Sequence, residues 1–381
     1  FFYLTTLIFT YLTHESFGIH IEEKFHRLNG LFWLNYISDI FRLDYFKEIT
    51  EIKINEIFDY TLNRPSYFNR YGVVLDLPVA FIEVAFNINN VKQIYYLKHL
   101  LSFFIFLLSS FCFFKILFQR YKNFFLSFIG LILYVTTPRI FGDSFLYKDV
   151  LYLSFFTFSL YFFFKSIDKI SFSNLIFLAL FSSLSVNLRI FSLLIPIIFI
   201  FIVVVKNFYK NELIEDLKKI FIYLFFFLVF LYLFWPFLWS SPLNNFLDIF
   251  RYLTRDLIDV KILYNGEFIS NRLVPETYLL NWIFISTPLV QSILFFFGLF
   301  YCFTRIIRRY IKITPNSIFN DLWRSKKEEK DFIVVIFIVC FYLLFQIFNA
   351  PMYNGWRLFY FFNFFIIYFS INFLYLIKIK F

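Results

Sequence analysis

The amino-acid sequence consists largely of apolar runs of helix length, which recur from one end to the other. Hydrophobic residues make up 60% of the chain and its mean hydropathy is +0.71, values far outside the range of soluble globular domains. Because the hydrocarbon layer of a membrane holds no water to pair backbone N–H and C=O groups, each run must pair its own backbone as an α-helix. The runs also lack the alternation of barrel strands. We therefore predict an all-α polytopic membrane protein.

The positions of the apolar runs predict about ten transmembrane helices in a single transmembrane domain that covers residues 1–381. Residues 174–205 would form one helix of about 48 Å, too long for a hydrocarbon core of about 30 Å, so two helices turning at 185–189 are expected. The first run opens the sequence without a methionine, and we expect it to be a truncated, retained anchor. The predicted spans are residues 1–13, 99–118, 124–138, 149–164, 174–187, 190–205, 219–236, 283–304, 332–349 and 358–377.

The loops between these spans differ in charge. Those on one side hold 19 Lys/Arg and 8 Asp/Glu, whereas the other side keeps 17 of the chain's 36 Lys/Arg and 18 of its 26 Asp/Glu. An excess of positive charge marks the cytoplasmic side, so the overall charge of +10 requires no nucleic-acid partner. The basic loops are residues 115–123, 165–170, 206–219, 305–331 and the C-terminal tail.

Two long loops, residues 14–98 and 237–282, then lie on the outer side and carry the predicted working surface. In the first of them, Asp76-Leu77-Pro78 precedes an apolar run whose only charge is Glu83. An acidic residue and a proline at the start of such a run predict a helix that lies at the membrane interface.

The first outer loop places two acids, Glu22 and Glu23, directly after the first span, with three histidines nearby. A carboxylate at the membrane surface can deprotonate a hydroxyl nucleophile. The plainer interpretation is that both acids are solvated and pair with Lys24 and Arg27. The motif alone does not decide between these interpretations.

A second outer stretch, TPRIFGDSFLYKDV, gathers Arg139, Asp143, Lys148 and Asp149 between the third and fourth spans. In a purely structural interpretation, Asp149 caps a helix and Arg139 pairs with Asp143 one turn away. In a functional one, Asp143 or Asp149 orients the first-loop acid or a sugar, and Lys148 meets phosphate. Both interpretations stay open.

Two single arginines, Arg189 and Arg357, lie in apolar surroundings at the outer ends of spans, where a charge is costly and usually has a partner. A guanidinium binds phosphate bidentately, so an anionic lipid headgroup would suit them, although they could also simply reach the interface. A third stretch near Tyr264 and Glu267 adds further candidate substrate contacts, or an interfacial aromatic belt.

The order of these features resembles the GT-C superfamily of membrane glycosyltransferases, in particular its dolichyl-phosphate-mannose-protein mannosyltransferase-like and ArnT-like branch. Such proteins carry an acidic pair, usually Asp-Glu, where IEEKFHR stands here. They also have a second outer loop like PRIFGDSFLYKD, an interfacial helix before the second span and a late Gly-Trp-Arg element, here YNGWRLFYF. Glu22 replaces the expected Asp, so either the geometry compensates, or Glu23 serves, or activity is altered.

The resemblance implies transfer of a sugar, with inversion, from a polyprenyl-phosphate donor to an acceptor hydroxyl on the outer face. It implies a general base in the first loop, supporting acids in the second, and basic side chains at the phosphate. No cofactor is firmly implied and no metal ligand is assigned, while a divalent metal at the acid cluster stays open. The candidate residues are Glu22, Glu23, Asp143 and Asp149 for catalysis, and Lys148, Arg139, Arg189, Arg357, Tyr264 and Glu267 for substrate or phosphate.

The same resemblance implies a bacterial inner membrane or its equivalent, with membrane lipids and an acceptor of unknown kind (protein, lipid or glycan) as partners. The rival functions are a lipid or glycan transporter, a polymerase or ligase of surface glycans, and an inactive scaffold. A transporter predicts charges at mid-membrane and broken helices in a repeated arrangement. Here the polar groups gather at the outer helix ends, which favours an enzyme.

Overall fold

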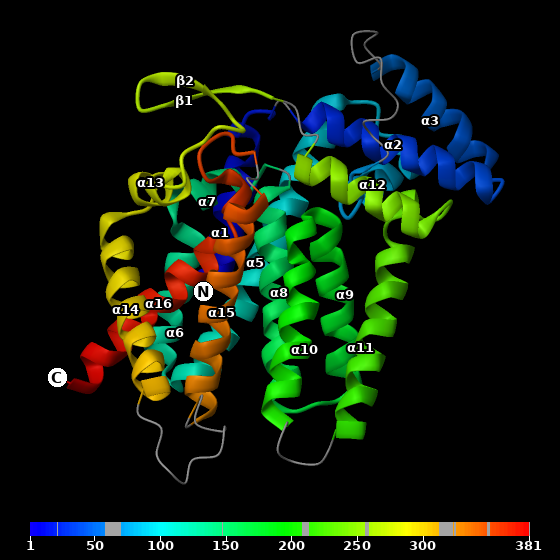
Figure 1. Cartoon of the computed structure of the whole chain (residues 1–381). Helices are drawn as coiled ribbons and strands as arrows, with labels where there is room; N and C mark the ends of the chain where they lie inside the picture. Colours follow the sequence, from blue (N-terminus) through cyan, green and yellow to red (C-terminus); the bar gives the residue numbers. More distant parts are fainter. Residues whose placement is uncertain are drawn as a thin grey trace.

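Most of the chain folds as a bundle of helices whose long members stand side by side (Figure 1). Within the described residues, strands occur only in one short hairpin. The predicted all-α class is therefore confirmed. The computed structural model describes residues 1–20, 22–57, 70–146, 148–207, 213–255, 259–311, 323, 325–348 and 351–380.

A helix coincides with each of the predicted apolar runs. In the part of the chain that the structure describes, five of these helices, α5, α8, α14, α15 and α16, are long and apolar enough to cross a membrane, which supports a membrane protein. The bundle helices are α1 (Phe2–Thr13), α5 (Val91–Tyr121), α6 (Phe124–Thr136), α8 (Asp149–Asp168), α9 (Phe172–Leu188), α10 (Leu194–Asn207), α11 (Leu213–Leu233), α14 (Leu289–Ile311), α15 (Lys326–Phe348) and α16 (Phe362–Lys380).

Two helix boundaries depend on single residues. The predicted turn at 185–189 is confirmed, because α9 ends at Leu188, Arg189 is extended, and the short helix η4 (Ile190–Leu193) leads into α10. The predicted span 283–304 begins later than expected, at Leu289. Proline lacks the backbone N–H that a helix interior needs and disfavours a helical residue before it, so Pro288 separates α13 (Tyr278–Ser286) from α14.

The centre of the bundle is α8. Nearly all of its side chains are buried, and it packs between α5 and α9 while also touching α16. A helix that is apolar on every side needs apolar surroundings, either lipid or other helices, and for α8 these surroundings are mostly its neighbouring helices. Phe156 on α8 illustrates this packing, with its ring edge-on to Phe341 and Phe361 at centroid distances of 5.6 and 5.2 Å. The position of α8 fixes its first residues at one end of the bundle.

That end is covered by shorter elements, and we call it the capped end (Figure 1). The hairpin there turns at Asn265–Gly266, both with positive φ, as a two-residue Asn-Gly hairpin turn requires. The helix predicted after Asp76 is confirmed as α4. The covering elements are α2 (Glu23–Ile40), α3 (Asp44–Ile57), α4 (Asp76–Ala85), α7 (Pro138–Asp143), α12 (Pro242–Arg255), β1 (Lys261–Tyr264), β2 (Glu267–Ser270) and α13.

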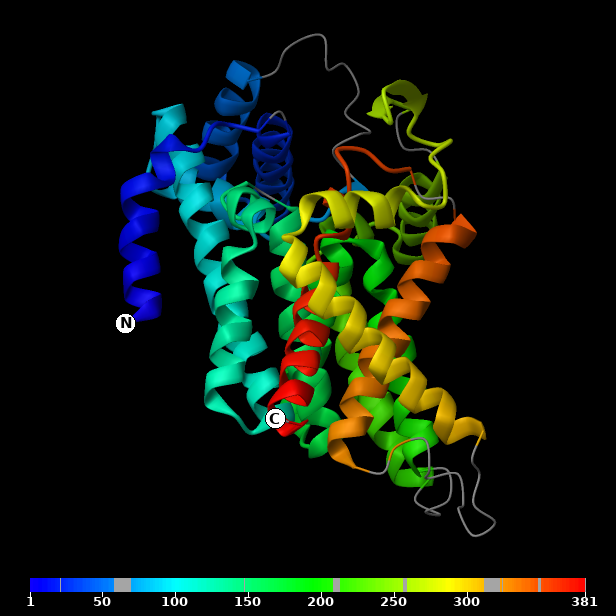
Figure 2. The same cartoon turned by 90° about the vertical axis from the view of Figure 1, so that its left-hand side faces the viewer.

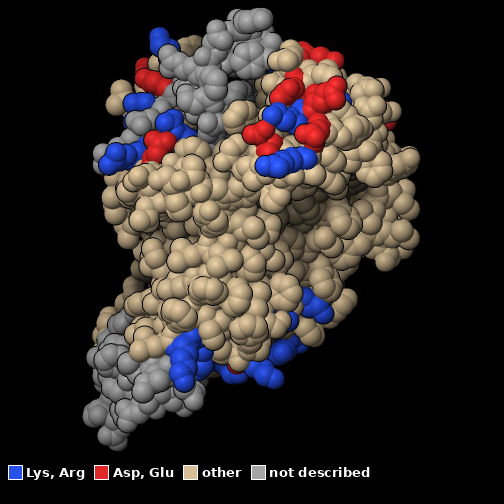
Figure 3. All heavy atoms as spheres, turned by 90° about the vertical axis from the view of Figure 1, so that its right-hand side faces the viewer, with Lys and Arg blue, Asp and Glu red and all other residues tan. Residues whose placement is uncertain are grey.

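Charged side chains gather at the two ends of the molecule. In the face drawn in Figure 3, Lys, Arg, Asp and Glu lie at the capped end, Lys and Arg dominate the opposite end, and a broad band without them lies between. Figure 2 shows α1 at the edge of the bundle, beside α5. An apolar band between charged ends is the surface that a bilayer core requires.

Buried ion pairs join the elements of the capped end. Arg27 of α2 binds both carboxylate oxygens of Glu83 on α4, with N···O distances of 3.1 and 2.7 Å. The plainer interpretation of the first-loop acids, in which Arg27 pairs with Glu22 or Glu23, is therefore not what the structure has. Glu83 is fully buried, so losing Arg27 would leave a desolvated carboxylate with Lys53, 3.5 Å away, as its remaining ion-pair partner. This pair fixes α4 against α2, and with it the chain that precedes α2.

Candidate functional site

The buried carboxylate of Asp149, at the first turn of α8, lies between two arginines. Arg189, at the turn between α9 and η4, donates to one of its oxygens, and Arg357 donates to the other through Nε. Arg357 begins the short helix η7 (Arg357–Phe359), after the Asn354–Gly355 turn. A buried carboxylate is tolerated only with such partners. We call Asp149, Arg189, Arg357 and Glu22 the Asp149 cluster.

Glu22 joins this cluster from the first loop. Its Oε2 accepts from Nη2 of Arg357 at 2.5 Å. Burial alone would raise the pKa of Glu22, but the positive charges of Arg357 and Lys148 outweigh burial and lower it. The carboxylate therefore stays ionised at neutral pH. The structure thus brings the first-loop acid Glu22 and the second-loop acid Asp149 onto one guanidinium.

Glu23 points away from the Asp149 cluster. It is buried, and both of its carboxylate oxygens lie near Nε2 of His99 on α5, at 3.0 and 3.2 Å. Successive residues of a helix differ in direction by about 100°, so the start of α2 sends the two neighbouring acids to different surroundings. Glu23 therefore does not reach the site predicted for it.

Lys148 precedes α8 and has a backbone φ of 96°, a positive value that residues other than glycine rarely adopt. Its buried Nζ lies 4.0 Å from the ring centroid of Tyr71, a cation–π contact. Burial, together with the nearby charges of Arg189 and Arg357, lowers the pKa of Lys148 to about 7, although Glu22 and Asp149 oppose the shift. The N-cap position of α8 is occupied by Lys148 and not, as in the purely structural interpretation, by Asp149. The carboxylate of Asp149 instead accepts hydrogen bonds from the two arginines.

Arg139 and Asp143, at either end of α7, meet the same hydroxyl group. Nε of Arg139 donates to the Tyr360 hydroxyl at 2.7 Å, and this hydroxyl donates to Asp143. Arg139 also donates to the backbone carbonyl of Asn354 at 2.7 Å. A side chain at Gly355 would approach Arg139 to 3.1 Å, so glycine suits this close approach. The predicted direct Arg139–Asp143 pair is replaced by a bridge through Tyr360.

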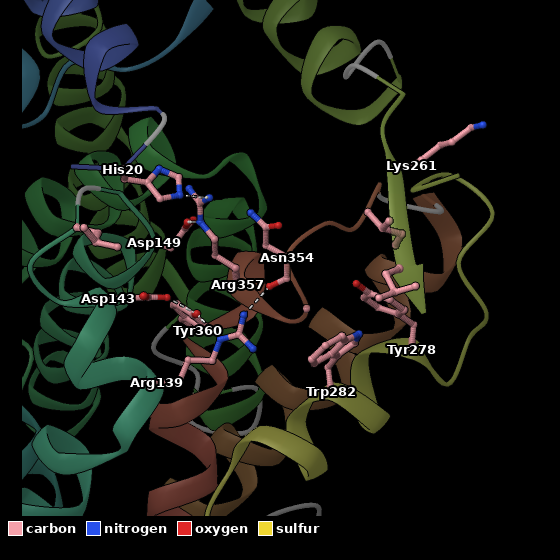
Figure 4. Close-up of a pocket in the computed structure, with 14 residues that line it drawn as sticks. His20, Arg139, Asp143, Asp149, Lys261, Tyr278, Trp282, Asn354, Arg357 and Tyr360 are labelled. Atoms are coloured by element: carbon pink, nitrogen blue, oxygen red, sulfur yellow. Dashed lines mark hydrogen bonds and ion pairs between the residues drawn. The ribbon is translucent and has the colours of Figure 1, made fainter. Parts of the chain in front are cut away.

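A cavity of about 500 Å³ opens beside these groups, within the size range of small-molecule sites (Figure 4). One wall is ionic and the other, built by β1 and α13, is largely apolar and aromatic. Glu22 contacts Arg357 of the Asp149 cluster but does not line this cavity. The ionic wall is formed by His20, Arg139, Asp143, Asp149, Arg357 and Tyr360, and the other wall includes Lys261, Ile262, Leu263, Tyr278 and Trp282.

Two predicted residues of the hairpin do not line the cavity. The ring of Tyr264 packs on Tyr278 at a centroid distance of 5.0 Å, and its hydroxyl accepts from Asn281. Glu267 is exposed on β2. Of this third stretch, the neighbours Tyr278 and Trp282 face the cavity instead.

Sequence reasoning left out other residues that the site contains. His20 lies two positions before Glu22, and Tyr360 lies three positions after Arg357. Both sit inside motifs that the sequence analysis singled out, the first-loop acids and the Gly-Trp-Arg element. A search of one helical turn around each predicted charge would have found them.

The acids of the site do not form a metal-binding group. Among the described residues, no three His, Cys, Asp or Glu side chains are grouped so as to hold a metal ion. The oxygens of Asp149 already accept from two arginines, and Asp143 accepts from Tyr360. These groups do not fit the divalent metal that the acid cluster left open, and no step of the chemistry below passes through one.

Comparison with known proteins leaves the site to be interpreted from its own geometry. No protein-family model, curated protein or solved structure matches the chain. The class that fold and site define is therefore a helical membrane protein with an ionic cavity at the capped end.

Proposed function

We propose that this protein is an integral membrane glycosyltransferase of GT-C type. It transfers a sugar from a polyprenyl-phosphate donor to a hydroxyl group of an acceptor. In this proposal all ten apolar helices cross the membrane, and the capped end faces outward, because the loops at the opposite end carry the excess of Lys and Arg. A bacterial inner membrane, or its equivalent, is the proposed location.

The observation that carries the proposal is the Asp149 cluster beside a large cavity at the capped end, where α8 begins. A lipid phosphate lies at this depth in a bilayer, so its charge and the cluster would meet without either entering the hydrocarbon core. Nε of Arg189 is buried and has no hydrogen-bond partner among the described residues. A buried donor of this kind is costly unless a ligand oxygen pairs with it.

The chemistry follows from the charges around the cavity. The bond between the sugar carbon and the phosphate oxygen breaks, and the same carbon bonds to the acceptor oxygen from the opposite face, so its configuration inverts. Arg357, which lines the cavity, stabilises the negative charge that develops on the leaving phosphate, and Arg189 and Lys148 add positive charge from outside the cavity wall. Glu22, kept ionised by Arg357, does not line the cavity, but its side chain is about one-third exposed beside Arg357; in this proposal the acceptor hydroxyl approaches from that side and gives its proton to Glu22. Asp143 and Asp149 hold the neighbouring hydroxyl and guanidinium groups in position.

Other proteins that bind lipid-linked sugars could use a similar cluster, namely a transporter or flippase, or a polymerase or ligase of surface glycans. A polymerase or ligase would transfer a glycan chain instead of a single sugar. A transporter would bind the lipid phosphate without releasing sugar. These outcomes differ in a single assay, because a glycosyltransferase transfers one radiolabelled sugar, a polymerase or ligase transfers a chain, and a transporter leaves the donor intact.

The test uses the purified chain with a panel of radiolabelled polyprenyl-phosphate sugars. Wild type is compared with Glu22→Gln, Asp143→Asn and, as a matched control, Glu23→Gln, whose carboxylate lies away from the site. Sugar release that is lost in Glu22→Gln and kept in Glu23→Gln supports the enzyme and its base. Loss in Asp143→Asn alone would assign the base to Asp143. Binding of lipid phosphate without release from any donor would instead support a transporter.

A further inference from the structure

The imidazole of His20 has a hydrogen-bond donor at each of its two ring nitrogens. The backbone N–H of Glu22 donates to Nδ1 at 3.2 Å. On the other side, Nη1 of Arg357 lies 3.2 Å from Nε2. A neutral imidazole has only one nitrogen that can accept, and an imidazolium has none. One of these two contacts therefore sets a donor against a donor.

The backbone settles which contact is mismatched. Both neighbours can only donate, but the N–H of Glu22 is fixed by the backbone and has no other acceptor among the described residues, whereas Arg357 lines the cavity, where a ligand oxygen can accept from Nη1. We therefore assign the lone pair of His20 to Nδ1 and its proton to Nε2. The N–H groups of Nε2 and of Arg357 Nη1 consequently face the same space without an acceptor between them.

This space belongs to the cavity. His20 and Arg357 both line the cavity, and Figure 4 draws their contact at the upper end of its ionic wall. Arg357 cannot turn away to relieve the mismatch, because its Nε donates to Asp149 and its Nη2 to Glu22. Two donor nitrogens 3.2 Å apart can both bond one oxygen that lies at about 2.8–3.0 Å from each.

We propose that His20 and Arg357 form a two-donor site for one anionic oxygen, and that His20 serves there as a neutral hydrogen-bond donor and not as a base. The bound oxygen is one of the phosphate oxygens of the lipid-linked substrate; this assignment rests on the proposed function, whereas the site itself does not. Arg357 supplies charge, while His20 adds direction, as paired donors do at an oxyanion.

The experiment measures binding of a sugar-free polyprenyl phosphate to the purified full chain in lipid nanodiscs. Glutamine places its amide nitrogen near the position of histidine Nε2, whereas asparagine reaches only as far as Nδ1. His20→Gln should therefore keep affinity within about three-fold, and His20→Asn and His20→Ala should each lose about ten-fold or more, as for a hydrogen bond to a charged group. Inorganic phosphate, tested as a competitor, separates a site for any phosphate from one that needs the lipid.

Three results would overturn the proposal. Equal affinity in all variants would mean that no donor acts at His20. Equal losses in His20→Gln and His20→Ala would assign the residue a packing role. Unchanged binding with sugar transfer lost in every variant would make His20 the base instead. If transfer fails with every donor but the binding pattern holds, the proposed function fails and the two-donor site stands.

A measurement on wild type avoids any variant that does not fold. The chain has four histidines, so ¹⁵N-histidine labelling gives a short spectrum, in which the tautomer of each ring is distinguishable. His20→Gln identifies the signal of His20. The proposal requires a proton on Nε2 and none on Nδ1. A His20 ring with its proton on Nδ1 would contradict the proposal.

Discussion

Two buried aspartates, at opposite ends of the bundle, are each held by two arginines. Asp149 at the capped end accepts from Arg189 and Arg357. Asp331 at the opposite end accepts from Arg120 at 2.7 and 2.6 Å and from Arg305 at 2.7 Å, and also from the Tyr368 hydroxyl at 2.8 Å. We call Asp331, Arg120, Arg305 and Tyr368 the Asp331 cluster. The two clusters use the same chemistry in different surroundings.

The difference lies in what each cluster leaves unpaired. Asp331 is completely buried at the start of α15, with donors from α5, α14 and α16 around it, so its cluster joins four helices. Asp149 lines a cavity, Nε of Arg189 has no hydrogen-bond partner in the described part of the chain, and His20 faces Arg357 donor to donor. A buried arginine–carboxylate pair is therefore no sign of function by itself. Unused donors beside a cavity are the stronger sign.

The largest effect is expected from breaking the Asp331 cluster. Asp331→Ala would leave Arg120 and Arg305 buried without their carboxylate and should lower the free energy of unfolding by roughly 3–5 kcal/mol. Denaturant unfolding of the purified protein measures this loss. Lipid-phosphate affinity of the fraction that remains folded should not change. A wild-type stability in this variant would refute the structural role of the cluster.

Removing one arginine from each cluster sharpens the comparison. Arg357→Ala should reduce sugar transfer roughly 10²–10³-fold, because a donor to the developing phosphate charge is lost. Arg305→Ala, the matched variant at the opposite end, should lower stability while each folded molecule keeps its rate. The measurement is the rate of sugar transfer per folded molecule of each variant. Similar losses in both variants would mean that the two clusters do not differ in function.

The neighbouring acids of the first loop give a smaller but cleaner contrast. Glu22→Gln should slow transfer roughly 10²-fold, since the proton acceptor is lost. Glu23→Gln should instead cost about 1–3 kcal/mol of stability, because Glu23 is the buried partner of His99, and transfer should persist. Steady-state kinetics beside thermal unfolding separate the two effects. Reversed results would mean that Glu23 is the active acid.

Lipid-phosphate binding should depend on pH through Lys148, whose pKa is lowered to about 7. Below that pH the ammonium is charged and attracts phosphate, and above it the charge is lost, so affinity should fall as pH rises through about 7, by at most about ten-fold per unit. Lys148→Arg, which stays charged, should show only the ionisation of the phosphate itself, so the ratio of wild-type to variant affinity should fall as pH rises through about 7. A ratio that does not change with pH would contradict the role of Lys148.

The smallest effect is expected at Glu267. The residue is exposed on β2 and does not line the cavity, so Glu267→Ala should alter transfer by less than about two-fold, as usual for surface substitutions. Trp282→Ala, on the aromatic wall, provides the contrasting variant. A large loss in Glu267→Ala would show that the hairpin reaches the substrate in a different arrangement.

Sequence reasoning predicted most of the helices but only part of the site. Apolar runs predict where helices lie, because their backbone must pair within the helix. Helix ends are also local: one helix ends before the extended Arg189, and Pro288 separates two others. Single charges in apolar surroundings, such as Arg357, also stand out, because burial forces them to find a partner. Tyr264 and Glu267 were chosen on the same grounds, yet the hairpin turns Tyr264 onto α13 and Glu267 to solvent.

The sequence by itself determined that the chain is an all-α membrane protein whose isolated charges gather near helix ends, because long apolar runs allow no other backbone solution. Only the tertiary structure decided which charges meet. Glu22 and Glu23 are identical in type and adjacent in sequence, and the docking of α2 sends one to Arg357 and the other to His99. Partners hundreds of residues apart are chosen by helix packing, a global property that no local pattern encodes.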